Sequence, residues 1–239
     1  MTARVRYKRV LLKLSGEALL GDKPFGIDDA VTGRLAAEVA AAVKLGVKLG
    51  LVIGGGNIFR GMTVAAGGGN RVAGDQMGML ATVMNAIAFE QKLAAAGLKT
   101  RLFSAVPMPT ICEVFNQRSA QTAFDAGEVV LFAGGIGSPF VTTDTGAALR
   151  AAEMGADALF KATMVDGVYT ADPKRHPDAI RYDRLTFDEA IDKGLKIMDI
   201  AAMALARDNG IPIIVFSIHE PGAFIDILKG RGRATVVAG

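Results

Sequence analysis

Three consecutive glycines, Gly54 to Gly56, directly follow an apolar run from Val47 to Ile53. The length and β-branched content of that run are typical of a buried strand in a parallel sheet. Glycines at a strand end allow positive φ angles and bring bare N–H groups close to a ligand. With Arg60 nearby, such amides suit an anion such as phosphate. The alternative is a tight turn whose glycines only relieve crowding.

The composition indicates a globular protein with ample core, since 51% of the 239 residues are hydrophobic and 21% are charged. The net charge of +3 is mild and its basic residues are scattered, which favours anionic small molecules over nucleic acid as partners. The single cysteine, Cys112, excludes an internal disulfide and suits a reducing compartment. Because no signal peptide or membrane-spanning stretch is evident, we expect a cytoplasmic protein that inserts into no membrane.

Apolar runs alternate along the chain with segments of helical periodicity, which predicts an α/β fold with a mostly parallel sheet covered on both faces. Strands are expected at 9–14, 47–53, 99–104, 128–132, 157–161, 212–216 and 234–238. The first helix would be capped by Asp28 or Asp29, and a long one would open at Asp75. Asp166-Gly167 is typical of a tight hairpin. We find no repeat or linker, so one domain over 1–239 is expected, with a functional division near residue 150.

A second glycine turn, Gly134 to Gly137, ends the strand expected at 128–132 and precedes Asp144 at a helix start. Two such turns on neighbouring parallel strands would face one crevice, where open α/β sheets bind ligands. Lys13 and Lys161 lie near the ends of two other strands. Lys13 could extend its ammonium group into solvent, or it could hold an anion at that edge.

Several familiar motifs are missing. There is no glycine fingerprint for dinucleotides after the first strand, no P-loop and no Gly-x-Ser-x-Gly. The two histidines, His176 and His219, form no metal or triad pattern and are expected to be exposed.

The remaining inventory comprises two anion-binding turns, the cations Lys13, Arg60 and Lys161, and the carboxylates Asp144 and Asp199 at helix starts. Phosphoryl transfer needs this set, because it depends on positioning two anions and on positive charge around the moving group. Magnesium would be held largely by phosphate oxygens, so no protein ligands for it are assigned.

Five motifs occur in order between residue 8 and the chain end: 13–17 (KLSGE), 54–61 (GGGNIFRG), 70–79 (NRVAGDQMGM), 137–144 (GSPFVTTD) and 165–173 (VDGVYTADP). Through them the chain resembles the bacterial UMP kinases of the amino-acid kinase superfamily. The resemblance implies ATP and UMP as substrates, UDP and ADP as products, magnesium, and an αβα sandwich assembled as a homohexamer. It also implies that UMP binds mainly to the part of the chain up to about residue 150 and that ATP binds mainly to residues 151–239.

The same resemblance assigns residues. Those implied for ATP are Lys13, Leu14, Ser15, Gly16, Gly56, Arg60, Thr163, Tyr169 and Asp172. Those implied for UMP are Gly55, Asp75, Ile136, Gly137, Ser138, Pro139, Phe140, Val141, Thr142 and Thr143. Catalysis would rest on Lys13, Arg60, Asp144, Lys161 and Asp199. The aspartates would orient lysines or magnesium, and no general base is assigned. The carboxylate of Asp75 can be a helix cap, accept from ribose hydroxyls, or do both.

Regulation rests on the resemblance alone. It implies activation by GTP and inhibition by UTP, with an effector loop made of Gly21, Asp22, Lys23, Pro24, Phe25 and Gly26. The sequence departs from the family pattern at Met164, where lysine is frequent, and at the loose Gly67-Gly68-Gly69 stretch. Two rival functions are a kinase acting on a carboxylate or carbamate, and a non-catalytic nucleotide-binding protein on the same fold.

Overall fold

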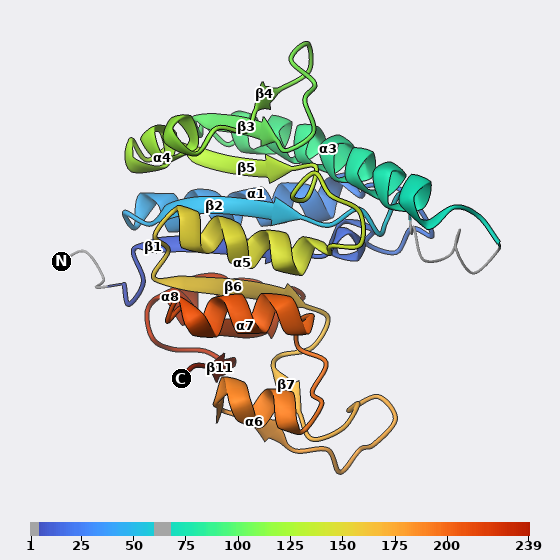
Figure 1. The fold of residues 1–239 in the computed structure, drawn as a ribbon. Coiled ribbons are helices and arrows are strands. Elements are labelled where there is room, and N and C mark those ends of the chain that lie inside the picture. Colours follow the sequence, from blue (N-terminus) through green and yellow to red (C-terminus); the bar gives the residue numbers. More distant parts are fainter. Residues whose placement is uncertain (1–4, 60–67) are drawn as a thin grey trace.

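The computed structural model describes residues 5–59 and 68–239, and Figure 1 shows one large sheet running through them. Nine strands form this sheet in the order β4-β3-β5-β2-β1-β6-β10-β11-β9. All neighbours run parallel except β10 and β11. The expected α/β fold with a mostly parallel sheet is therefore confirmed.

The strands of the sheet are β1 (Arg9–Leu14), β2 (Lys48–Ile53), β3 (Thr100–Ser104), β4 (Glu113–Val114), β5 (Val129–Ala133), β6 (Ala158–Thr163), β9 (Arg184–Leu185), β10 (Ile213–Ser217) and β11 (Thr235–Val237). A separate antiparallel pair consists of β7 (Val168–Tyr169) and β8 (Arg181–Tyr182). The helices are η1 (Gly16–Leu19), α1 (Asp29–Lys44), α3 (Arg71–Ala95), α4 (Gln117–Asp125), α5 (Thr143–Glu153), α6 (Phe187–Asp192), α7 (Ile200–Asp208) and α8 (Ala223–Leu228).

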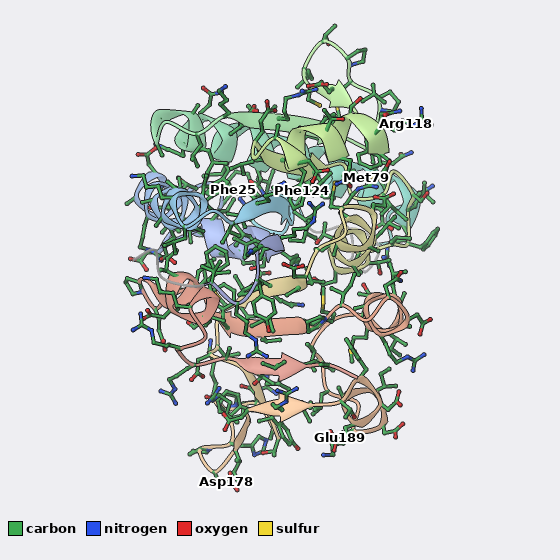
Figure 2. All side chains as sticks on the ribbon, turned by 90° about the vertical axis from the view of Figure 1, so that its left-hand side faces the viewer. Phe25, Met79, Arg118, Phe124, Asp178 and Glu189 are labelled. Carbon is green, nitrogen blue, oxygen red and sulfur yellow. The ribbon has the colours of Figure 1, made fainter. Side chains whose placement is uncertain are left out.

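Helices cover both faces of the sheet, as the turned view in Figure 2 shows, so the fold is an αβα sandwich. One apolar core lies between the sheet and helices α1, α3 and α8, and contains Phe89 and Phe224. A second core lies under α4, α5, α6 and α7, and contains Phe124 and Phe187. Alternate residues of each strand feed the two cores, as Leu11 and Leu12 do, because successive side chains of a strand point to opposite faces.

All the described helices except η1 and α8 begin at residues whose side chains accept from backbone N–H groups. Asp28 accepts from Val31 N at the start of α1, as one of the two expected caps. Asp199 accepts from Ala202 N at the start of α7. The cap of α3 is Asn70, which accepts from Val72 N and Ala73 N. The expectation that Asp75 opens this helix is wrong, because Asn70 supplies an earlier cap and leaves Asp75 inside the second turn.

Two further expectations need correction. The Asp166-Gly167 turn does not close a tight hairpin between the strands on either side of it, β6 and β7. Instead, β7 pairs with β8, more than ten residues further along the chain. The short strands β4, β7, β8 and β9 were not anticipated, since strands of two residues carry too little periodicity to detect. No helix in the described ranges is long and apolar enough to cross a membrane.

A glycine inside β2 offers a test of this packing. A Cβ on Gly50 would lie 2.8 Å from Leu11 Cδ1 and 3.1 Å from Phe132 Cε2. Because both neighbours belong to a close-packed core, Gly50→Ala should lower the free energy of unfolding by about 1–3 kcal/mol. Gly33→Ala is the matched control. Gly33 lies in α1, and a Cβ added there would meet open space, so the substitution should raise the free energy of unfolding by about 0.5–1 kcal/mol. Urea denaturation of both variants checks the prediction, and equal effects would contradict it.

Candidate functional site

The two glycine turns lie at neighbouring strand ends, as expected. β2 pairs in parallel with β5, so the turn after Ile53 and the turn after Ala133 emerge at the same edge of the sheet. A cavity of about 470 Å³ opens between them and is lined by Gly55 and Gly56 on one side and by Gly135 and Ser138 on the other. We call it the first cavity.

Lys13 and Lys161 are brought side by side by strand register. They are direct partners in the β1–β6 ladder, at the edge of the sheet where the glycine turns lie. Asp144, in the first turn of α5, lies between them: its Oδ1 is 2.8 Å from Lys13 Nζ and its Oδ2 is 2.7 Å from Lys161 Nζ. We call these three residues the charged triad. Lys161 Nζ also donates to Ile197 O at 2.6 Å.

Lys13 does not extend into solvent, because only 7% of the residue is exposed. Burial tends to raise the pKa of Asp144, but the charges of Lys13 and Lys161 outweigh it and hold that pKa below its ordinary value. Burial lowers the pKa of Lys161, and the charge of Lys13 adds to this against the opposing charge of Asp144. The triad therefore presents positive charge that is only partly neutralised, a suitable environment for an anion.

Asp199 fixes the helix that carries Asp144. Its Oδ1 accepts from Thr145 Oγ1 at 2.7 Å and from Ala202 N at 2.8 Å, and its Oδ2 accepts a short hydrogen bond from Thr142 Oγ1. Thr142 is itself the N-cap of α5. The contacts of this carboxylate are thus hydroxyl groups and an amide, whereas the carboxylate of Asp144 contacts the lysines. The hydrogen bonds of Asp199 therefore act on the lysines through α5.

Asp75 links α3 to the loop after β5. Its carboxylate accepts from Arg71 Nε at 2.8 Å and from Phe140 N at 2.8 Å. Burial tends to raise the pKa of Asp75, but these two hydrogen bonds and the Arg71 charge hold it below its ordinary value. Phe140 has φ +67°, a left-handed conformation that costs about 1–3 kcal/mol for a non-glycine residue. Asp75 therefore holds the loop in a strained conformation beside the first cavity.

A second cavity, of about 500 Å³, lies beyond Lys161, which is part of its lining. The structure places Thr163, Tyr169 and Asp172 together in its wall. Tyr169 Oη donates to Asp166 Oδ1 at 2.5 Å, which raises the pKa of the phenol and fixes the ring position. The two cavities thus lie on either side of the charged triad, because Thr143, next to Asp144, lines the first.

The remaining candidates are distributed as follows. Residues of the UMP set that line the first cavity are Gly55, Asp75, Ser138, Val141, Thr142 and Thr143, and Gly56 of the ATP set joins them. Ile136, Gly137, Pro139 and Phe140 belong to the same loop without lining the cavity. Leu14, Ser15 and Gly16 follow Lys13 into η1, and the backbone of Gly16 packs against Gly54 and Gly56. Arg60 and Gly67 fall outside the described residues.

The loop from Gly21 to Gly26 lies apart from the lining of either cavity. It is tied to the first glycine turn, since Gly26 N donates to Asn57 O at 3.1 Å. Phe25 of this loop is 63% exposed and is labelled in Figure 2. His176 and His219 are both exposed, as expected, and His219 Nε2 lies 3.1 Å from Met164 Sδ.

Several residues that line the first cavity were given no role from the sequence, among them the polar residues Glu17, Arg71 and Thr82. Arg71 had a usable signal, because it precedes Asp75 by four residues and such a spacing places both on one helix face. The expected helix began too late to include it. Thr82 lies in the middle of an apolar-periodic helix, where a threonine carries no signal of its own.

Comparisons with known proteins agree along the whole chain. Residues 8–217 match the model of the amino acid kinase family. The uridylate kinase of Rhizobium meliloti is 60% identical over 237 residues, 99% of each chain, and that of Brucella abortus is 58% identical over 238 residues, 100% of this chain and 99% of the relative. The crystal structure of UMP kinase from Bacillus anthracis superimposes with a TM-score of 0.94 at 37% identity, over 97% of this chain and 96% of that one. The crystal structure of UMP kinase from Ureaplasma parvum superimposes with a TM-score of 0.93 at 34% identity, over 98% of this chain and 100% of that one.

The charged triad makes a prediction about stability. Asp144→Asn would leave the buried Lys13 and the largely buried Lys161 without their shared carboxylate, so the free energy of unfolding at pH 7 should fall by about 3 kcal/mol. Because the pKa of Asp144 is depressed in the folded state, its contribution is present above about pH 4 and is lost as the pH falls further. The gap between wild type and variant should therefore shrink toward pH 3.

Denaturation with urea at several pH values measures this gap. Asp188→Asn is the control, because Asp188 pairs with Arg207 at the surface and should contribute less than about 0.5 kcal/mol. A gap that stays constant from pH 7 to pH 3 would show that the carboxylate charge is not what holds the lysines.

Proposed function

The chain belongs to the amino acid kinase family and has uridylate kinases as full-length relatives, and on this premise we propose that it transfers the γ-phosphoryl group of ATP to UMP, giving ADP and UDP. The observation that carries the proposal is the charged triad between two cavities. Lys161 lines the second cavity, and the neighbour of Asp144 lines the first. A phosphoryl group passing from one nucleotide to the other would cross this positive region.

The residues divide between the nucleotides. For ATP we propose Lys13, Leu14, Ser15, Gly16, Gly56 and Arg60 at the phosphates, with Thr163, Tyr169 and Asp172 at the nucleoside. For UMP we propose Gly55, Asp75 and residues 136–143. In this arrangement one domain over 1–239 binds UMP mainly with its part up to about residue 150 and ATP mainly with 151–239. Gly56, assigned to the ATP phosphates, lines the first cavity next to Gly55 of the UMP set, so the two sets would meet at the first glycine turn.

The chemistry assigned to the protein is electrostatic. Lys13 and Lys161 would stabilise the charge that spreads over the transferred group, and Asp144 would keep both ammonium groups aimed at it. Arg60 would bind phosphate oxygens with its guanidinium group. Asp199 would keep α5, and with it Asp144, in position through Thr142 and Thr145. The protein would thus act by orienting two anionic substrates, with no covalent intermediate of its own.

Magnesium would enter with ATP as part of the substrate. The described residues contain no group of three histidine, cysteine or acidic side chains that could hold a metal ion, and both oxygens of Asp144 already face lysines. This arrangement fits Mg²⁺, which commonly keeps water and phosphate oxygens as most of its ligands. When bound, the ion would neutralise phosphate charge and bridge its oxygens.

The first cavity favours a nucleotide over a small acid as the acceptor. Its volume of about 470 Å³ lies in the range of small-molecule sites, and its described lining contains acidic Glu17 and Asp75. Its described cation, Arg71, is paired with Asp75. A pocket for a small carboxylate or carbamate would call for more positive charge. A non-catalytic binding protein would have no use for the triad, which is complete here.

The wider proposal includes activation by GTP, inhibition by UTP, a homohexamer and a cytoplasmic location. The Gly21–Gly26 loop is offered as the effector segment. Its support is a hydrogen bond to the first glycine turn, through which a change in the loop could reach the phosphates.

The test of the function is ADP release from Mg-ATP with UMP, CMP, AMP and a panel of small carboxylates at matched concentrations. We expect turnover with UMP far above that with the other acceptors. Turnover on an acid and none with UMP would keep the fold and overturn the acceptor.

Lys13 can be tested separately. Lys13→Met keeps the length of the side chain and removes its charge, so kcat should fall about 10²- to 10³-fold, as happens when one preorganised charge-stabilising group is lost. UMP affinity, measured by calorimetry, should stay near that of the wild type, because Lys13 is assigned to the donor phosphates. Lys44→Met, an exposed lysine at the end of α1, is the control and should keep wild-type kcat. A Lys13→Met enzyme with normal kcat would remove Lys13 from the mechanism.

A further inference from the structure

Helix α3 carries two buried polar side chains one turn apart, Thr82 and Asn85. Thr82 is 3% exposed and Asn85 is fully buried. They occur among apolar neighbours such as Val83 and Ala86, which belong to the core. A buried polar group is tolerated where its hydrogen bonds are satisfied, so the partners of these two residues indicate their role.

Thr82 contacts the second glycine turn. Its Oγ1 accepts from Gly134 N at 2.8 Å and donates to Met79 O at 2.6 Å. Gly134 has φ +72°, and a Cβ there would lie 2.8 Å from Ser104 Oγ. The turn therefore depends on a glycine at this position, and the hydroxyl group of Thr82 holds its first amide against α3.

Asn85 contacts the first glycine turn. Its Nδ2 donates to Gly54 O at 2.7 Å and to Asn57 Oδ1 at 2.7 Å. Asn57 returns the bond, since its Nδ2 donates to Asn85 Oδ1 at 2.9 Å and to Gly26 O at 2.9 Å. Every amide hydrogen of the two side chains thus has an acceptor.

The first turn also packs directly on α3. A Cβ on Gly55 would lie 2.8 Å from Gly78 O and 2.9 Å from the Cβ of Ala81. A Cβ on Gly16 would lie 2.5 Å from Asn57 Oδ1. The turns that follow β1 and β2 are therefore in contact with each other and with the helix, and a shift of α3 would move them together.

We infer that Thr82, Asn85 and Asn57 are positioning residues that set the separation of the two glycine turns, and so the distance between donor and acceptor phosphates. Because Thr82 and Asn85 lie three positions apart on one rigid helix, the helix fixes the distance between the points at which they hold Gly134 and Gly54. This rests on the proposed function, which assigns the first turn to both nucleotides and the second turn to UMP. The residues would raise kcat through geometry without binding either nucleotide themselves.

The expected effect is large because phosphoryl transfer depends on the alignment of two substrates. A displacement of about 1 Å can cost about 100-fold in rate. Affinity is less sensitive, since each nucleotide can follow its own turn. Loss of positioning should therefore appear in kcat and leave the separate dissociation constants nearly unchanged.

The experiment uses the full-length enzyme and three variants. Thr82→Val is nearly isosteric and leaves Gly134 N without its acceptor. Asn85→Leu leaves Gly54 O and the Asn57 amide without their partner. We expect kcat to fall about 10- to 100-fold in each, with Kd for UMP and Kd for ATP, measured separately by calorimetry, within about threefold of wild type. Thr82→Ser keeps the hydroxyl group and should restore kcat.

The matched control is Thr32→Val. Thr32 is also a buried helical threonine, but its hydroxyl group bonds only within α1 and its cap, to Asp28 O and Asp29 O. It should leave kcat unchanged. If Asn85→Leu does not fold, the comparison of Thr82→Val with Thr82→Ser decides the case.

Two results would overturn the inference. One is a folded Thr82→Val enzyme with wild-type kcat and only a lower Tm. Another is a Kd for UMP that weakens as much as kcat falls, which would make Thr82 a binding residue. Wild-type turnover, measured alongside, separates the two proposals: an active wild type with unaffected variants rejects this inference alone, and a wild type silent with UMP rejects both.

Discussion

Two lysine ammonium groups lie next to each other, one on the buried Lys13 and one on the largely buried Lys161, and this is the constraint on which the site depends. The β1–β6 register makes Lys13 and Lys161 direct partners, so their charges cannot be separated without shifting the whole ladder. A shared carboxylate is the arrangement that makes such a pair tolerable, because an unpaired charge in a protein interior is costly. Asp144 must therefore lie at this position in the first turn of α5. Thr142, Thr145 and Asp199 can be understood as the contacts that hold the helix start there.

Positive charge that is only partly compensated costs stability when no anion is bound. The lowered pKa of Lys161 expresses this cost, since folding disfavours its charged form. Phe140 adds a second cost, in the form of a left-handed backbone held by Asp75. Both lie within the candidate site, outside the two apolar cores on either side of the sheet. These two unfavourable features thus lie where a ligand could offset them.

Much of the fold could be predicted from the sequence, because most of its strands and helices are long and strongly patterned. The run 129–133 is apolar throughout and the run 9–14 is mostly apolar, and the glycines that follow them mark one edge of a parallel sheet. The prediction failed where a signal was local or ambiguous. Asn70 and Asp75 are both good helix caps, and only the fold decides between them. The hydrogen bonds of Thr82 and Asn85 were not predictable, because the sequence does not show which buried polar groups will meet which turn.

The central position of β1 has a consequence for how the chain folds. This strand pairs with β2 on one side and with β6 on the other, so residues 9–14 contact residues 158–163 across most of the chain. During synthesis, the strands from β1 to β5 can assemble while the outer edge of β1 still lacks its partner. An apolar strand with a free hydrogen-bonding edge is a template for association between chains. The interval before β6 emerges is therefore when a nascent chain is most exposed to aggregation, and the contacts that complete the sheet are of the long-range kind that form slowly.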